Sequence, residues 1–172
     1  MEIQKFENFN IDGICKVRFA LLEEVSQISF PDDEHTVTIT LVGGKQMIEM
    51  YFTRQKEDLK INEVQDDSGT WFQIDLALIN PSLDPSKAVT FKSLRNKDLI
   101  FVITDNNGRD MLIGSIDKPA RITSKLSIPG SGMNQRGVNV RANSDFEPYF
   151  VADEILISGG ALSNGFSNGF SI

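Results

Sequence analysis

The sequence predicts a mainly β fold, a β-rich α+β domain built as an antiparallel β-sandwich or barrel with one short helix near residues 84–95. Three observations predict it. Residues 99–104 are a β-branched and aromatic run that is apolar on both alternating faces. Residues 36–42 alternate apolar side chains with threonine, which is typical of a half-buried strand. Helical spacing of apolar residues is convincing in residues 84–95 alone.

The segment 98–123 is the predicted centre of the fold. The run 99–104 is followed by Asp-Asn-Asn-Gly at 105–108 and by a second apolar run at 111–116. Asn and Gly accept the backbone conformations of a tight reversal, so the two runs are predicted to form a β-hairpin. A strand that is apolar on both faces belongs in the middle of a core.

The remaining strands follow from alternation and turn residues. Residues 36–53 are predicted to form a hairpin closed by Gly43-Gly44. Residues 14–25 favour a strand, with a helical turn over 20–25 as the alternative. Four further strands are expected at 57–65, 70–79, 138–142 and 154–157.

The expected helix at 84–95 has its own start signals. Asp84 can accept hydrogen bonds from the first free amides, and Pro85 suits the first helical position. Ala88, Phe91 and Leu94 then recur on one face.

We expect three parts in the chain: an N-terminal arm at 1–12, a core domain at 13–158 and a tail at 159–172. The tail repeats Ser-Asn-Gly-Phe in tandem at 163–170. Such a composition cannot fold alone, yet its apolar side chains are unfavourable in water. We therefore expect five apolar residues at the two ends to make assembly contacts: Phe6, Phe9, Phe166, Phe170 and Ile172. The alternative is a tail with no binding role.

Composition limits the classes of function. The chain has 17 Lys and Arg against 24 Asp and Glu, a net charge of −7, which opposes general nucleic-acid binding. The single cysteine, Cys15, excludes an intramolecular disulfide framework and a multi-cysteine zinc site, and a packed thiol is expected there. A basic, apolar leader and a membrane-spanning run are not found, so a soluble cytosolic product is expected.

Few residues point to chemistry. His35 is the single histidine, and it lies beside Asp32, Asp33 and Glu34. This group could serve a hydrolase or bind a cation, but a solvated acidic turn is the preferred interpretation. The segment 105–110 has part of a calcium-loop pattern but lacks its distal glutamate, and a hairpin turn is preferred. We expect no catalytic residue, cofactor or metal.

The segment 101–126, the glycine-rich loop after it and residues 136–150 together resemble a known family. It consists of small tail or neck ring proteins of tailed phages and prophages of Bacteroidetes-type hosts, such as the crAss-like phages. The resemblance covers roughly residues 60–150. The matching positions are Asp105, Asn107, Gly108, Gly114, Ser115, Pro119, Arg121, Arg136, Gly137, Val138, Ser144 and Pro148.

The resemblance implies a non-enzymatic virion component that forms a homo-oligomeric ring. Its expected partners are other copies of itself and the portal, tail or ring proteins next to it. It is expected to line or support the passage of genomic DNA without specific binding, with an acidic surface limiting adhesion, and to contact no membrane. The expected locations are the virion and, before assembly, the host cytoplasm. The alternative is a monomeric carbohydrate- or ligand-binding β-sandwich that uses Trp71 and Tyr149.

Overall fold

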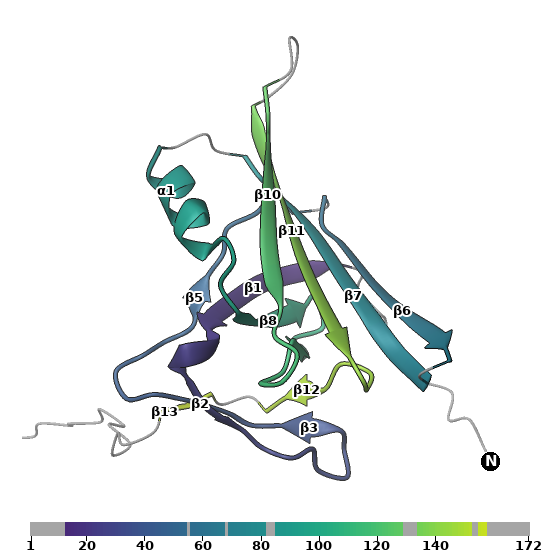
Figure 1. The fold of residues 1–172 in the computed structure, drawn as a ribbon. Helices are drawn as coiled ribbons and strands as arrows, with labels where there is room; N and C mark the ends of the chain where they lie inside the picture. Colours follow the sequence, from purple (N-terminus) through teal and green to yellow (C-terminus); the bar gives the residue numbers. More distant parts are fainter. Residues whose placement is uncertain are drawn as a thin grey trace, which may run out of the picture.

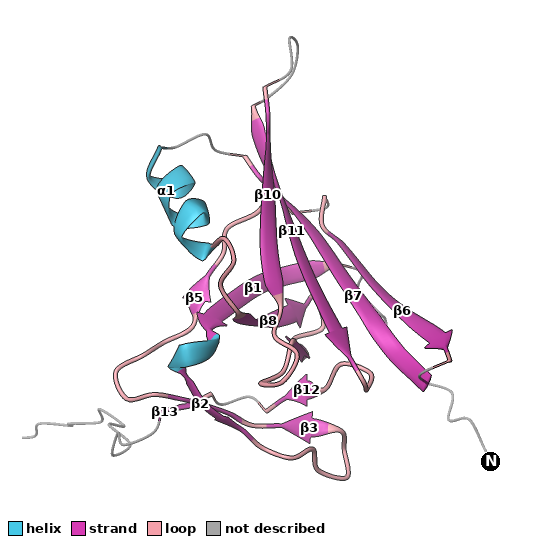
Figure 2. Cartoon of the chain, viewed as in Figure 1, coloured by secondary structure: helices cyan, strands magenta, loops and turns pink. Residues whose placement is uncertain are grey.

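The computed structural model describes residues 13–54, 56–67, 69–81, 85–128, 134–152 and 155–157. Within these residues the chain is mostly strand, with three sheets and one α-helix (Figure 2). Strand pairing is antiparallel except at two short pairs, β12 with β3 and β13 with β4. The predicted β-rich fold with one short helix is confirmed.

The largest sheet has six strands in the order β3-β12-β9-β8-β1-β5. The hairpin β8–β9 lies at its middle, as predicted, and turns at 105–109. The strands are β1 (Ile14–Leu21), β3 (Thr36–Val37), β5 (Ile48–Glu49), β8 (Leu99–Asp105), β9 (Asp110–Ile113) and β12 (Phe150–Val151).

Strand β8 is buried on both faces, which confirms its predicted place. Leu99, Phe101 and Ile103 belong to one hydrophobic core, and Ile100 and Val102 belong to a second one on the other side of the sheet. All five side chains are at most 2% exposed. The apolar character of both alternating faces therefore reflects two separate cores that share one strand.

A second sheet of four long strands packs over the first core. Its order is β10-β11-β7-β6, and each neighbouring pair is antiparallel. The strands rise beyond the six-stranded sheet as a tall, twisted ribbon (Figure 1). They are β6 (Asp58–Asp66), β7 (Gly69–Asn80), β10 (Arg121–Ser127) and β11 (Gln135–Ser144).

The helix α1 (Pro85–Leu94) closes one side of this first core. Phe91 and Leu94 are buried in it, as the spacing predicts. Residue 84, the expected cap, lies outside the described residues.

The third sheet covers the second core. It has the order β13-β4-β2 and consists of β2 (Val25–Ile28), β4 (Ile39–Leu41) and β13 (Leu156–Ile157). Val37, Ile39 and Leu41 are each at most 1% exposed, so the alternation predicted for residues 36–42 is confirmed. The segment predicted as a strand or helical turn at 14–25 contains both, because the 3-10 turn Leu22–Glu24 separates β1 from β2.

The hairpin predicted over residues 36–53 is wrong. Strand β4 pairs with β2 and β13, whereas β5 pairs with β1 at the edge of the six-stranded sheet. The reversal exists, since the Lys45 amide donates to the Val42 carbonyl over 3.0 Å and Gly44 has a φ of 78°. The chain after it leaves for another strand because β2 and β13 already occupy both edges of β4.

Two boundaries differ from the prediction for local reasons. Strand β9 ends at Ile113 because Gly114 has a φ of 90°, which takes the chain out of the sheet. Strand β11 is twice as long as the predicted 138–142, since its polar ends pair with β7 and β10. The expected arm at 1–12 and the tail from 159 onward lie outside the described residues.

Candidate functional site

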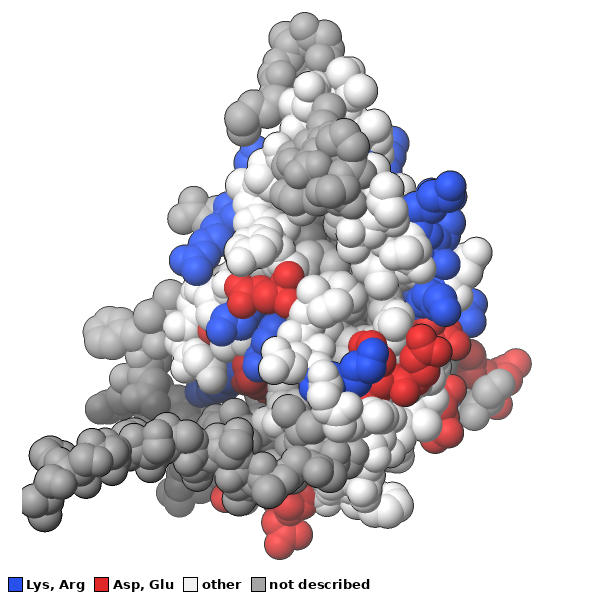
Figure 3. Space-filling view, turned by 90° about the vertical axis from the view of Figure 1, so that its left-hand side faces the viewer, with Lys and Arg blue, Asp and Glu red and all other residues white. Residues whose placement is uncertain are grey.

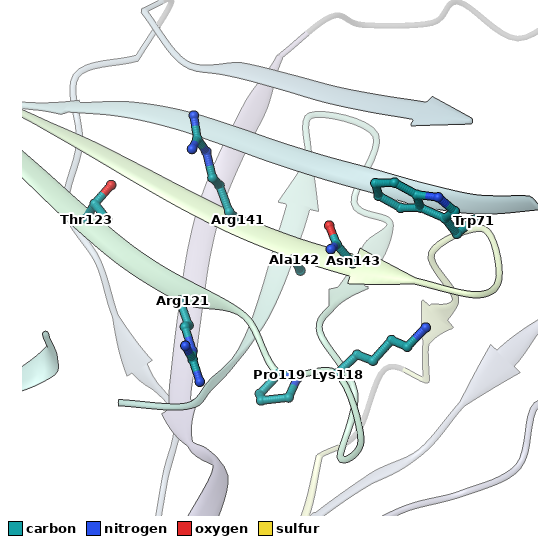
Figure 4. Close-up of a pocket in the computed structure, with 8 residues that line it drawn as sticks. All are labelled: Trp71, Lys118, Pro119, Arg121, Thr123, Arg141, Ala142 and Asn143. Carbon is teal, nitrogen blue, oxygen red and sulfur yellow. The ribbon is translucent and has the colours of Figure 1, made fainter. Parts of the chain in front are cut away.

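The outward face of the four-stranded sheet carries a wide concavity. It is a shallow hollow of about 720 Å³ whose lining includes Trp71, Lys118, Arg121, Arg141 and Asn143 (Figure 4). These side chains come from β7, β10, β11 and the chain leading into β10. By strand alternation they lie opposite the buried side chains of the first core.

Trp71 is half-buried at this hollow rather than placed in a core. Its indole N–H donates to Asp66 Oδ2 over 3.0 Å, so the ring is tied to the end of β6. The nearby cations also have partners: Arg141 Nε lies 2.9 Å from Asp75 Oδ1, and Lys118 forms an ion pair with Asp145. The hollow therefore presents an aromatic ring among paired charges.

The two outer strands of this sheet differ in charge. Strand β6 has one lysine against three acidic residues, whereas β10 has two basic residues and no acidic one. On β6, Asp58 Oδ2 lies 2.9 Å from Lys60 Nζ, and this hydrogen bond and charge raise the pKa of Lys60. On the side that bears α1 and β5, Lys and Arg lie in the upper and middle parts of the molecule, and Asp and Glu lie in the middle and at the bottom (Figure 3).

On both outer strands, some apolar side chains on the face that packs against the core are still exposed to water. Ile61 of β6 is 36% exposed, and Leu126 of β10 and the adjoining Ile128 are 47% and 65% exposed. Among the described residues, no strand lies beside β6 or β10 on its outer edge in the sheet order, although Ala120, just before β10, is bridged to Leu99 of β8. Free edges of this length expose a row of amide and carbonyl groups that another strand can bind.

Beside the edge of β10 the structure leaves room for such a strand. A hollow of about 310 Å³ lies between Phe91 and Arg95 of α1 and Ile122 and Ser124 of β10. Strand addition next to a helix is a common way in which proteins bind an extended segment.

A separate apolar groove of about 270 Å³ lies where ends of all three sheets meet, and the loops after β2, β9 and β11 line most of it. Its floor includes the buried Val37 and Leu112, and its rim has Phe30, Ile116 and Phe146, which are 95%, 48% and 60% exposed. Exposed apolar clusters of this kind mark interaction surfaces.

The predicted pairing of Trp71 with Tyr149 in one ligand site is not what the structure has. Tyr149 lines the apolar groove, where its ring centre lies 6.1 Å from that of Phe146, whereas Trp71 lines the sheet hollow. Lys118 is the side chain that lines both.

The acidic turn around His35 is held by backbone contacts. Asp32 Oδ1 accepts hydrogen bonds from the amides of Glu34 and Thr36, over 3.0 and 2.8 Å. The His35 ring packs at a tilt of 51° against that of Tyr149, with ring centres 4.4 Å apart, and its Nε2 lies 3.3 Å from the Glu147 carbonyl oxygen. The carboxylate expected to assist His35 thus stabilises the turn, which agrees with the preferred interpretation.

The turn at 105–109 is built in the same way. Asp105 Oδ1 accepts from the amides of Asn107 and Arg109, each over 2.8 Å. In the described part of the chain no group of three or more His, Cys, Asp or Glu side chains is placed to hold a metal ion. Cys15 is half-buried, and its thiol donates to the Asp105 carbonyl over 3.2 Å.

The five expected assembly residues, Phe6, Phe9, Phe166, Phe170 and Ile172, lie outside the described residues. No family model, curated protein or solved structure matched the chain. No helix among the described residues has the length and hydropathy needed to cross a membrane.

Sequence reasoning did not find the two free edges or the apolar groove. Strand order decides which strands end a sheet, and no local pattern encodes strand order. The exposed Phe30, placed before Pro31 between two short strands, was the one local signal for the groove.

Proposed function

We propose that this protein is a structural subunit that closes head to tail into a homo-oligomeric ring. The observation that carries the proposal is the four-stranded sheet with free edges of opposite charge on β6 and β10. In such a ring, β6 of one copy pairs with β10 of the next.

Strand direction supports this pairing. The sheet has an even number of alternating strands, so β6 and β10 run in opposite directions. A copy related by rotation about an axis near the strand direction keeps its strands pointing the same way. Its β6 then meets β10 in antiparallel orientation, and the ladder continues from copy to copy.

Charge supports the same pairing. Across the sheet, Thr123 pairs with Asn139, Asn139 with Ala77 and Ala77 with Asp58, so Thr123 and Asp58 lie at one level. An unstaggered neighbour places its Asp58 opposite Thr123, diagonal to Arg121 and Lys125 on the same face, but it also places Lys60 directly opposite Arg121, which is unfavourable. A stagger of one two-residue step places Asp58 opposite Lys125 and Lys60 opposite Thr123, which removes the like-charge pair. The opposite step would bring β6 against Ala120, which is already bridged to Leu99.

Burial is the third argument. With Asp58 opposite Lys125, the neighbour's Ile61 lies opposite Ile122, its strand fills the space beside α1, and Ile61 loses its contact with water. Each fully buried aliphatic side chain contributes about 1.5–3 kcal/mol.

The resemblance of residues 60–150 to tail and neck proteins supports placing this ring in a phage particle, around the path of the genome. If the outward face of the four-stranded sheet lines the channel, the strands present nearly balanced charges to it. The basic residues are Lys60, Arg121, Lys125 and Arg141, and the acidic ones are Asp58, Asp66 and Asp75. DNA would then meet a nearly neutral wall rather than the strongly acidic one expected from composition.

The test is the mass of the full chain in solution, measured by native mass spectrometry and viewed by negative-stain electron microscopy. We expect closed rings for the native chain and loss of rings for Asp58→Lys, which places like charges across the edge. Asp58→Lys combined with Arg121→Asp and Lys125→Asp should restore them.

Asp33→Lys is the matched control, because Asp33 is exposed in the loop between β2 and β3 and lies on neither strand of the proposed contact. It should leave the rings intact. A native chain that stays monomeric at high concentration, or rings unaffected by Asp58→Lys, would contradict the proposal.

The second candidate is a carbohydrate-binding module, favoured by the Trp71 hollow. An indole held in place by Asp66, with Asn143 and Arg141 nearby, offers a stacking face and polar groups for sugar hydroxyls. A glycan array probed with the native chain tests it. Binding abolished by Trp71→Ala would support this candidate, and no bound glycan would remove it.

A further inference from the structure

We propose that the apolar groove rimmed by Phe30, Ile116 and Phe146 binds the C-terminal segment 163–172 of a neighbouring copy. The inference rests on the proposed assembly, because it requires copies to lie side by side. In this proposal, the core domain carries the binding site for the segment that repeats Ser-Asn-Gly-Phe.

The groove has the size and chemistry for a phenyl ring. Its volume is about 270 Å³, and a cavity of roughly 150 Å³ lined by apolar side chains is enough to bind benzene. Val37 and Leu112 form an apolar floor, and Tyr149 contributes an aromatic wall. At the rim, Lys118 and Asp145 form an ion pair with each other, and the third charged residue, Asp117, is exposed, so the floor stays apolar.

The exposure of the rim indicates that the structure without a partner is incomplete there. Phe30 is 95% exposed although it lies only two residues after the end of the short strand β2. Burial of a phenylalanine side chain is worth about 1.5–3 kcal/mol, so a partner that covers Phe30 and Phe146 gains substantially.

The chain beyond the described residues fits this site. Residues 158–172 hold no charged side chain, and their aromatic residues are Phe166 and Phe170. In an extended segment these two side chains lie roughly 13 Å apart. Glycine, serine and asparagine between them allow the backbone to follow an irregular groove.

The direction of β13 favours a neighbouring copy over the same copy. Strand β13 runs parallel to β4, with Leu156 beside Thr40 and Ile157 beside Leu41. The groove lies at the other end of β4, where the Ser29 amide donates to the Thr38 carbonyl over 2.9 Å. The chain therefore leaves Ile157 heading away from its own groove, and nine residues to Phe166 can span about 30 Å.

Site-directed disulfide formation tests the contact in the full chain. The background is Cys15→Ser, which removes the single native thiol and keeps a hydroxyl donor for Asp105. One tagged chain carries Asp117→Cys at the groove rim, and a second chain with another tag carries Ser167→Cys between the two phenylalanines. Both phenylalanines and the apolar rim stay intact.

We expect the mixed sample to form a covalent dimer that carries both tags. Val89→Cys, an exposed position on α1, is the matched control and should give at least tenfold less dimer with Ser167→Cys. Ile116→Glu at the rim, or Phe166→Ser with Phe170→Ser in the tail, should reduce the specific dimer by a similar factor.

Equal yields from Asp117→Cys and Val89→Cys would overturn the inference. A compact cross-linked monomer from one chain carrying both Asp117→Cys and Ser167→Cys would overturn the choice of a neighbouring copy. If electron microscopy shows rings but the specific cross-link does not form, the tail contact is contradicted and the proposed ring stands. If no assembly forms at all, the proposed ring is contradicted.

Discussion

Leu99 and Ala120 exchange two backbone hydrogen bonds, each of 2.9 Å, and so join the centre of the six-stranded sheet to the start of the four-stranded sheet. Gly114 lies against this bridge. A Cβ atom at Gly114 would lie 2.8 Å from the Ala120 nitrogen and 3.2 Å from the Leu99 oxygen. The bridge holds the base of β10, and with it the orientation of the sheet edge proposed for assembly.

Gly114→Ala should therefore reduce the free energy of unfolding by about 3 kcal/mol, combining a positive φ with a clash against backbone. Gly108→Ala is the control, since its φ is 81° but nothing lies within 4 Å of the added carbon. It should cost about 1 kcal/mol. Urea unfolding followed by circular dichroism measures both, and equal losses would contradict the role of the close approach.

The ion pair between Arg18 and Asp110 should stabilise the centre of the large sheet. Asp110 also accepts a hydrogen bond from Thr104 Oγ1 over 2.5 Å, and both charged side chains are less than a quarter exposed. Asp110→Asn should cost about 1–3 kcal/mol because it leaves a partly buried guanidinium without its carboxylate.

The comparison for this pair is Asp98→Asn, which removes the exposed partner of Arg121. Its effect should stay within about 0.5 kcal/mol. Thermal or urea unfolding at neutral pH distinguishes the two, and a similar loss for both variants would show that burial does not strengthen the inner pair.

Phe101 should be the most costly single truncation in the first core. It is fully buried, and its ring centre lies 5.7 Å from that of Phe19. Phe101→Ala should cost about 3–5 kcal/mol through lost burial and the cavity left behind. Phe146→Ala, at an exposed position, should change stability by less than about 0.5 kcal/mol in the isolated chain. Chemical denaturation compares them.

Lys60 should titrate above its ordinary pKa of 10.5, because its ammonium donates to Asp58 and is attracted by that carboxylate. A raised pKa means that the contact stabilises the fold below pH 10.5 and that this contribution is lost as the pH rises through the higher value. Nuclear magnetic resonance titration of the lysine side chain measures the shift. In Asp58→Asn the pKa should fall back toward 10.5, and an unchanged value would assign the shift to another group.

The sequence by itself determined the local elements where one strong signal was present. The double-faced run 99–104 predicted the central strand, and the spacing of Phe91 and Leu94 predicted the buried face of the helix. Alternation in 36–42 predicted which side chains are buried, because a strand's two faces follow directly from the period of two.

The tertiary structure alone decided which strands pair, and so which edges stay free. Gly43-Gly44 permits a reversal but does not choose a partner, and β5 found its partner in β1 rather than in β4. The free edges of β6 and β10 and the groove at Phe30 arise from contacts between residues far apart in the chain. The energy of those contacts depends on the whole packed arrangement, which no local stretch of sequence specifies.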